Sequence, residues 1–351
     1  MAYGDNLEVF ASMPSARIAE LLQAVSGVRA ALLGDLSLDA YWTADMTQSE
    51  LSRETPHYPL PIVEERYSPG AGGNAAANIA ALQPKSLCVI GATGQDWRGD
   101  VLTRELATRS IDTSFIVRHP GIMTNAYIKP CRRGLSEQTQ EDARLDFANR
   151  VPQPADLEAL LIGALERAAP DIDVLCVSDQ FRHGSVTAPV REKIVRLAKT
   201  GLKVVVDSRE HIGLFPGCIL KPNELEGARA AGMERICGQR SAEGFAAAAE
   251  ELARRAGSPV CMTLGANGCL VAAKGALCLV PAAKRSPPLD ICGAGDTFLA
   301  AFGCSLAAGA AMREAAYIAN LASGVTVKKL GQTGTASREE ILAQCMPEAR
   351  Q

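Results

Sequence analysis

Hydrophobic residues along the chain fall into short runs separated by longer, alanine-rich stretches with helical periodicity. Short runs rich in Val, Leu and Ile are typical of strands buried on both faces of a sheet. We expect five such strands, Ala30–Leu33, Ser86–Ile90, Val174–Val177, Leu202–Val206 and Pro259–Leu264. The predicted helices are Asn74–Leu82, Arg98–Ser110, Asp156–Ala169, Pro189–Thr200, Ala242–Ala256, Gly295–Ala308 and Met312–Lys329. Because helical connections between buried strands allow right-handed crossovers, the pattern predicts an α/β fold with a mostly parallel sheet.

Two stretches interrupt this rhythm, Tyr41–Tyr67 and Gly121–Arg150. In both, alternating apolar positions mix with Pro, Thr and charged residues. We expect them to leave the main sheet and form a small lid or oligomer flap, in which residues 57–67 pair with residues 125–133. Plain surface loops are the alternative.

The chain is predicted to consist of a short N-terminal extension and one large domain. Residues 1–28 contain one amphipathic helix, Ser15–Val25, and residues 29–346 form the domain. At 351 residues and 47% hydrophobic residues, the chain is large enough to bury a substantial core.

Composition excludes several classes of protein. The 36 Lys and Arg residues against 39 Asp and Glu residues give a net charge of −3, so no bulk affinity for nucleic acid follows. There is no long uncharged apolar run, and the first residues lack the basic-then-apolar order of an export signal, so we expect a cytoplasmic protein without a membrane span. The 11 cysteines are scattered and odd in number, which favours reduced core residues. The four histidines show no zinc-ligand spacing.

The strongest local motif is LDICGAGDTFLAAF at residues 289–302, where glycines lead directly into a strongly helical run. The first-turn amides of a helix are unpaired and the helix dipole is positive there, so Gly293, Ala294, Gly295 and Asp296 can hold an anion such as a phosphoryl group. A carboxylate at Asp296 is then either an N-terminal cap or a base for an attacking hydroxyl.

Four other polar or glycine-rich segments follow predicted strands or open helices. They are residues 34–39 (GDLSLD), 69–74 (PGAGGN), 221–226 (KPNELE) and 263–268 (TLGANG). Because ligands of open α/β sheets bind at the carboxyl ends of the strands, these segments together predict a binding crevice.

Four motifs together resemble those of ribokinase-family (PfkB-type) carbohydrate kinases. They are the helix opening from Gly70 to Asn78, the pair Asn223/Glu226, the turn Thr263/Gly265 and the DxxGAGD segment from Asp290 to Asp296. The resemblance covers roughly residues 28–345. It implies a ribokinase-like three-layer sandwich with a mostly parallel central sheet and a small β lid. It also implies ATP-dependent transfer of the γ-phosphoryl group to a sugar hydroxyl. No Walker lysine motif occurs, and phosphoryl transfer needs positioning and charge neutralisation more than covalent chemistry.

The same resemblance assigns roles to individual residues. Asp296 would be the catalytic base, with the Gly293, Ala294 and Gly295 amides as the anion hole. Asp39, Gly70 and Asn74 would bind the sugar, and Glu226 with Asn223 would organise Mg²⁺ through water. Thr263, Gly265 and Gly268 would contact the nucleotide, and Asn320 would line the adenine pocket. A K⁺ ion would lie near Asp290. Without the family, Asn223 and Glu226 fit a helix cap with its capping-box partner equally well. Cys292 stands where a Thr is common in the family.

Within the family, the chain is most similar to D-glycero-D-manno-heptose 7-phosphate kinases, which make heptose 1,7-bisphosphate. The similarity lies in residues 34–42, 69–82, 144–149 and 319–337, and it implies substrate contacts by Arg144 and Asp146. A phosphorylated substrate also needs cations, for which Lys129, Arg132, Arg133 and Arg144 are candidates; a solvated basic face is the alternative.

The sequence departs from these kinases at three places. The usual Gly-Gly-Ala-Ala-Asn is replaced by residues 70–74 (GAGGN), the segment 178–184 is one residue longer, and Arg209 stands where a Lys is typical. Bifunctional relatives add a nucleotidyltransferase with an HxGH motif, which these 351 residues lack, so we expect phosphorylation without adenylylation. By analogy we also expect a homodimer that takes a small-molecule sugar or sugar phosphate.

Three other readings compete with the heptose kinase. A ribokinase-like, fructokinase-like or nucleoside kinase of the same superfamily is the main one. A non-catalytic sugar-binding relative is disfavoured because Asp296, Asn223 and Glu226 are intact. GAGGNA also matches the dinucleotide-binding pattern GxGxxA, but Pro69 precedes it where a buried strand should run.

Overall fold

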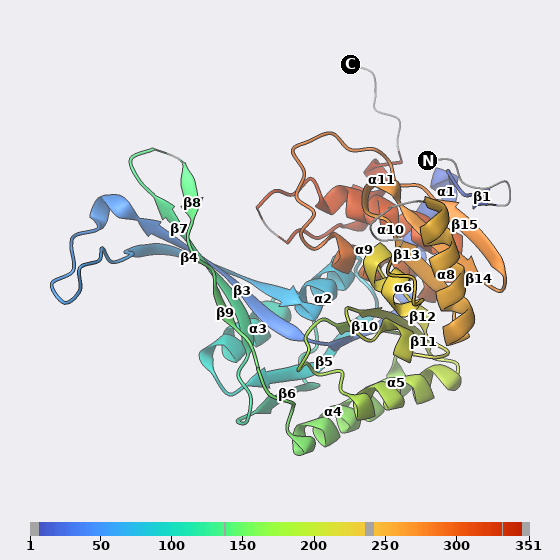
Figure 1. Cartoon of the computed structure of the whole chain (residues 1–351), viewed down its shortest axis with the longest axis horizontal. Coiled ribbons are helices and arrows are strands. Elements are labelled where there is room, and N and C mark those ends of the chain that lie inside the picture. Colours follow the sequence, from blue (N-terminus) through green and yellow to red (C-terminus); the bar gives the residue numbers. More distant parts are fainter. Residues whose placement is uncertain (1–6, 137, 236–241, 332, 346–351) are drawn as a thin grey trace.

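The computed structural model describes residues 7–136, 138–235, 242–331 and 333–345 (Figure 1). A ten-stranded sheet lies between two layers of helices, and a smaller five-stranded sheet projects from one side of this main body. The predicted class, a mostly parallel α/β sandwich with a small β lid, is therefore confirmed.

The main sheet has the order β1-β15-β14-β13-β12-β11-β10-β2-β5-β6. Its strands are β1 (Glu8–Val9), β2 (Arg29–Gly34), β5 (Ser86–Gly94), β6 (Ile116–His119), β10 (Val174–Asp179), β11 (Lys203–Ser208), β12 (Ile219–Leu220), β13 (Val260–Thr263), β14 (Cys269–Ala273) and β15 (Ala276–Val280). Among the described strands of this sheet, only the β13–β14 and β14–β15 pairs are antiparallel. The five predicted strands correspond to β2, β5, β10, β11 and β13.

Helices cover both faces of this sheet. They are α1 (Ser15–Ala24), α2 (Gly72–Ala81), α3 (Trp97–Ala107), α4 (Ala155–Ala168), α5 (Ala188–Lys199), α6 (Glu224–Ala230), α8 (Ala242–Ala256), α9 (Ala294–Ala307), α10 (Met312–Thr326) and α11 (Arg338–Ala343). Side chains of α1, α2, α3, α9, α10 and α11 share one hydrophobic core, and those of α4, α5, α6 and α8 share the other. In the described part of the chain, no helix is long and apolar enough to cross a membrane.

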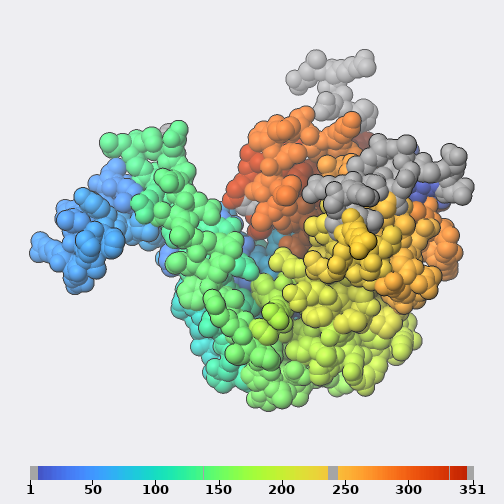
Figure 2. Space-filling view, in the orientation of Figure 1, coloured from blue at the N-terminus to red at the C-terminus, as the bar shows by residue number. Residues whose placement is uncertain are grey.

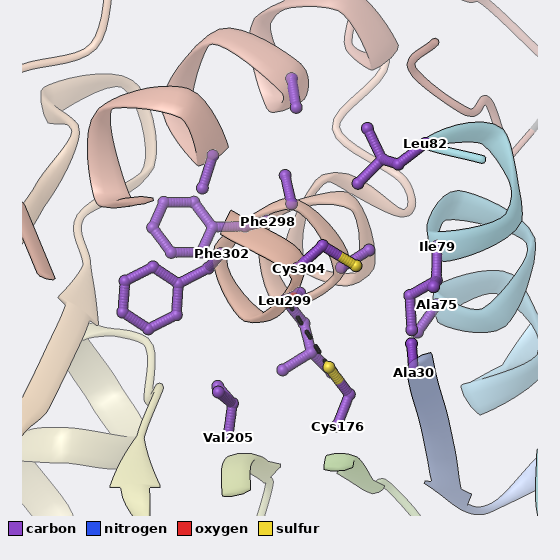
Figure 3. Close-up of a cluster of buried hydrophobic side chains, with 14 of the residues drawn as sticks. Ala30, Ala75, Ile79, Leu82, Cys176, Val205, Phe298, Leu299, Phe302 and Cys304 are labelled. Carbon is purple, nitrogen blue, oxygen red and sulfur yellow. Dashed lines mark hydrogen bonds between the residues drawn. The ribbon is translucent and has the colours of Figure 1, made fainter. Parts of the chain in front are cut away.

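Helix α9 is apolar on all sides, and its residues from Thr297 to Leu306 are buried. Figure 3 shows its side chains between α2 and the strands that carry Cys176 and Val205. The helix also packs along α10, and a Cβ on Gly303 would lie 2.5 Å from the Cys176 sulfur, so glycine permits this close approach. A helix buried in this way holds its N-terminus in a fixed position.

The small sheet, hereafter the lid, has the order β4-β3-β7-β8, with β9 also paired to β7. Its strands are β3 (Leu36–Asp45), β4 (Ile62–Ala71), β7 (Asn125–Arg133), β8 (Thr139–Glu141) and β9 (Leu145–Phe147). The predicted pairing of residues 57–67 with residues 125–133 was wrong, because β3 lies between β4 and β7. The lid also begins at Leu36, so Asp39 lies within a strand.

The N-terminal residues pack on the main body. Strand β1 pairs with β15, and Ile18, Leu21 and Leu22 of α1 belong to the core shared with α9. Ten cysteines of the described chain are free and seven of them are buried, as expected for reduced core residues. Cys237 lies outside the described residues.

Candidate active site

The N-terminus of α9 presents unpaired amides at the edge of the main sheet. Gly293 is the N-cap residue with a left-handed φ of 78°, and a Cβ there would lie 2.7 Å from the Asn74 side-chain nitrogen. Within the described residues, the amides of Gly293, Gly295 and Asp296 have no protein acceptor. The Ala294 amide, predicted as part of the anion hole, instead donates to Ile291 O at 3.2 Å because the chain turns tightly there.

Asp296 lies in the first turn of α9 with its carboxylate partly buried. It does not cap the helix; its Oδ2 accepts a hydrogen bond of 2.7 Å from Asn74 Nδ2. Burial is the main cause that raises the pKa of Asp296 to about 7; the Asn74 hydrogen bond opposes this rise and the Asp207 carboxylate adds to it. A carboxyl with a pKa near neutrality is suited to accepting a proton from a hydroxyl.

A buried polar network holds Asn74 against Asp296. Asn78 Nδ2 donates to Asn74 O at 3.0 Å, and Thr297 Oγ1 donates to Asn78 Oδ1 at 2.8 Å. Asn78 and Thr297 are both buried. Sequence reasoning gave neither residue a role, although an asparagine four residues after Asn74 in an otherwise apolar helix is a signal for such a contact.

A buried ion pair lies beside the first turn of α9. Lys221 Nζ is 2.7 Å from Asp207 Oδ2, and the two residues are 3% and 7% exposed. A Cβ on Gly295 would lie 3.9 Å from Lys221 Nζ, so this ammonium lies close to the unpaired amides. Lys221 lowers the pKa of Asp296, but the paired Asp207 carboxylate raises it more strongly. Sequence reasoning did not assign a role to either residue, although each directly follows an apolar run.

Asp39 provides a carboxylate on the lid. Burial raises its pKa, while Lys129 and Arg144 oppose the rise. Gly70 of β4 pairs with Ser37 and lies diagonally opposite Asp39. A Cβ on Gly70 would lie 2.5 Å from both Asp39 Oδ1 and Ser37 Oγ. Gly70 therefore leaves the room that the Asp39 carboxylate occupies.

Two of the predicted lid cations already have acidic partners. Arg144 forms two hydrogen bonds with Asp146, at 2.6 and 2.8 Å, and its guanidinium lies 4.7 Å from the Tyr127 ring centroid. Arg132 is 2.6 Å from Asp142. The predicted substrate residues Arg144 and Asp146 are thus brought together, each neutralising the other.

Asn223 and Glu226 form a complete capping box at the start of α6. Asn223 Oδ1 accepts from the Leu225 and Glu226 amides, at 2.9 and 2.8 Å, and the Asn223 amide donates to Glu226 Oε2 at 2.8 Å. Burial and the Asp207 carboxylate raise the pKa of Glu226. Its other oxygen has no protein partner among the described residues, which fits a hard cation bound through water.

The other predicted nucleotide residues lie near the ends of β13 and β15. Thr263 pairs with Asn223 in a parallel β-bridge, and Gly265 has a φ of 56°. Gly268 has a φ of 92°, and a Cβ there would lie 2.1 Å from Val280 O. Asn320 Nδ2 donates to the same carbonyl at 2.9 Å, so Asn320 joins α10 to the end of β15.

Asp290 organises the chain before α9. Its Oδ1 accepts from the Cys292 amide at 3.0 Å and its Oδ2 from the Gly331 amide at 3.1 Å. No group of three His, Cys, Asp or Glu residues that could hold a metal ion occurs in the described ranges. The K⁺ ion near Asp290 stays a prediction.

The lid and the α9 N-terminus face each other across an open space. Figure 2 shows a notch between the lid and the part of the main body built from the C-terminal third of the chain. Beside Asn74, a cavity of about 270 Å³ lies between the base of the lid and residues 333–335. This cavity reaches Asn74, but neither Asp39 nor Asp296 lines it.

The chain resembles known carbohydrate kinases. Residues 214–339 match the model of the pfkB family of carbohydrate kinases. The chain is 31% identical to the bifunctional protein HldE of Bradyrhizobium sp. (strain ORS 278) over 94% of its own length and 66% of that relative. It is 28% identical to HldE of Desulfatibacillum aliphaticivorans over 91% of its length and 63% of the relative. The chain therefore spans slightly less than two thirds of these relatives.

Solved structures show the same fold. Arabidopsis thaliana ribokinase complexed with ribose and ATP superposes with a TM-score of 0.66 at 19% identity, covering 90% of this chain and 98% of that chain. Escherichia coli phosphofructokinase-2 in complex with substrates and products gives 0.68 at 20% identity with the same coverage. These likenesses show that the chain has a ribokinase-like fold. Residues 214–339 of the chain are thus similar to carbohydrate kinases of the pfkB family.

Proposed function

We propose that the protein transfers the γ-phosphoryl group of ATP to a hydroxyl of D-glycero-D-manno-heptose 7-phosphate, giving heptose 1,7-bisphosphate. The observation that carries the phosphotransferase part is the Asp296 carboxylate, whose pKa is about 7, beside three unpaired amides of α9. The choice of sugar is supported by the similarity to the bifunctional HldE proteins and by the four stretches that resemble heptose 7-phosphate kinases.

In the proposed reaction, Asp296 accepts the proton of the sugar hydroxyl as its oxygen attacks the γ-phosphorus. The new P–O bond forms while the bond from the γ-phosphorus to the β–γ bridging oxygen breaks, and ADP leaves. The amides of Gly293, Gly295 and Asp296 donate to the charged phosphoryl oxygens, and the Lys221 ammonium, which is paired with Asp207, lies beside them. Donors held by a buried helix need no reorganisation when this charge develops.

The remaining residues are proposed to position the two substrates. Asp39 and Asn74 suit sugar hydroxyls, because a carboxylate accepts and an amide both donates and accepts hydrogen bonds. Thr263, Gly265, Gly268 and Asn320 would contact the nucleotide. When bound, Mg²⁺ held through water by Glu226 and Asn223 would neutralise charge on the phosphates.

We also propose that the protein forms a homodimer through the lid. The face of the lid opposite Asp39 is largely apolar, and Ile62 and Leu145 on it are 37% and 45% exposed. Sedimentation of the purified protein is expected to give twice the mass of one chain. A monomer at micromolar concentration would contradict this proposal.

An ATP-consumption screen tests the proposed function. The panel is heptose 7-phosphate, fructose phosphates, free ribose and nucleosides, with the Asp296→Asn variant as the inactive control. We expect the wild-type protein to consume ATP fastest with heptose 7-phosphate. Faster turnover of ribose or a nucleoside would favour the free-sugar or nucleoside kinase, and no consumption with any acceptor would favour a non-catalytic protein.

A further inference from the structure

Three side chains form one row across the lid, on the face that carries Asp39. Tyr41 of β3 pairs in register with Arg66 of β4 on one side and with Lys129 of β7 on the other. Residues that lie directly opposite each other in a sheet project from the same face. Asp39 lies two residues before Tyr41 and therefore shares this face, about 7 Å nearer the main body.

Both cations of this row contact the Tyr41 side chain. The Arg66 guanidinium lies 4.0 Å from the ring centroid, whereas Lys129 Nζ lies 4.9 Å from the centroid and 3.5 Å from the hydroxyl. Cation–π contact with one ring fixes both charges in place. A rigid pair of cations loses little conformational entropy when it binds an anion.

Neither cation has a carboxylate within ion-pair distance in the described part of the chain. Across the described ranges, no carboxylate forms an ion pair with Arg66 or Lys129, in contrast to the Arg132–Asp142 and Arg144–Asp146 pairs on the same lid. Two neighbouring positive charges repel each other, so an anion placed between them is stabilised. Their charges are thus available to a ligand.

The row also faces the reaction centre. Arg66 Nη2 donates to Gly331 O at 3.2 Å, and the Gly331 amide in turn donates to Asp290, which precedes α9. The charge of Lys129 acts on both Asp39 and Cys292. If a sugar binds at Asp39, the row formed by Arg66, Tyr41 and Lys129 therefore lies about one sugar length farther along β3.

We propose that Arg66, Lys129 and the Tyr41 hydroxyl bind the phosphate group that the sugar substrate already carries. This inference rests on the proposed function and deepens it. Arg66 keeps nitrogens besides Nη2 for the phosphate oxygens, Lys129 adds a charge-assisted hydrogen bond, and the hydroxyl donates a third. The row thereby makes the enzyme selective for phosphorylated sugars over free ones.

Paired substrates test this selectivity. KM is measured for D-glycero-D-manno-heptose 7-phosphate and for the unphosphorylated heptose in the wild type, Arg66→Gln and Lys129→Met. Each substitution is expected to raise KM for the phosphorylated sugar roughly 10- to 100-fold, because one charged hydrogen bond is lost. KM for ATP and for the free heptose should stay within about twofold of the wild type.

The matched control is Arg53→Gln, which removes an exposed lid arginine in the connection between β3 and β4 and should change none of these values. Lys129→Arg is expected to recover most of the affinity, which separates lost charge from damaged folding. If Arg66→Gln and Lys129→Met weaken both sugars equally, or neither, the inference is wrong.

Calorimetric binding of heptose 7-phosphate without ATP separates this inference from the proposed function. If the wild type binds heptose 7-phosphate more tightly than Arg66→Gln does but consumes no ATP, phosphate binding by Arg66, Lys129 and Tyr41 is supported and the kinase function is refuted. If ATP consumption is equally efficient with phosphorylated and free heptose, the proposed phosphate site is refuted and the kinase function is retained.

Discussion

Replacing Asp296 by asparagine is expected to abolish most activity and, at the same time, to stabilise the fold. The carboxylate is held with its pKa raised from 3.8 to about 7, mainly by burial. The folded protein therefore binds this proton more tightly than the unfolded chain does. The corresponding stability is fully present below about pH 4 and is lost as the pH rises through about 7.

The full shift corresponds to about 4 kcal/mol at 1.36 kcal/mol per pKa unit. Because the carboxylate is only partly buried and faces open solvent, we discount this to roughly 1–2 kcal/mol. An asparagine at position 296 can still accept the hydrogen bond from Asn74 and carries no charge. The substitution should therefore raise the melting temperature by roughly 2–6 °C at pH 8.5 and by less at pH 5.5.

The assay is thermal unfolding of both proteins at the two pH values, together with turnover in the ATP-consumption screen. We expect turnover to fall roughly 10²–10⁴-fold, the range for loss of a general base. The control is Asp142→Asn, which removes a lid carboxylate paired with Arg132 and should not stabilise the fold. If the Asp296→Asn variant is no more stable than the wild type at pH 8.5, the argument that burial raises the pKa of Asp296 is refuted.

Three further substitutions or conditions probe the same site. For the wild type, kcat/KM should rise with pH through about 7, because only unprotonated Asp296 accepts a proton; a pH–rate profile without this rise would contradict the assignment. Lys221→Met should lower the free energy of unfolding, measured in urea, by about 3–5 kcal/mol, because it leaves the buried Asp207 carboxylate unpaired. The double variant Lys221→Met/Asp207→Leu should regain most of the stability but not the activity. Gly70→Ala should raise KM for the sugar and leave KM for ATP unchanged, because its Cβ would displace the Asp39 carboxylate; equal effects on both substrates would argue against a sugar site there.

The parts of the fold that the sequence predicted are those governed by local pattern. The strands β2, β5, β10, β11 and β13 are short and apolar because both of their faces are buried. The start of α9 was predicted to within one residue, because Gly293 and Gly295 precede a strongly helical run. Strand β12 was missed since it has only two residues. Strands β14 and β15 were also missed, although the Lys274–Gly275 turn between them marks a hairpin.

The lid and the support of Asp296 depend on contacts between distant residues. Whether β4 pairs with β3 or with β7 is set by the packing of the whole lid, which alternation within a single strand does not reveal. The Lys221–Asp207 pair joins two strand ends, and Thr297 meets Asn78 across 219 positions. A single sequence shows such residues only as isolated polar positions beside apolar runs.

The most direct test of the central claim is a crystal structure with a non-hydrolysable ATP analogue and heptose 7-phosphate. We predict that one sugar hydroxyl lies about 2.6–3.2 Å from the Asp296 carboxylate. The terminal phosphate of the analogue should lie within hydrogen-bond distance of the Gly293, Gly295 or Asp296 amides. A sugar whose hydroxyls all lie beyond contact with Asp296, or a terminal phosphate bound away from α9, would contradict the account.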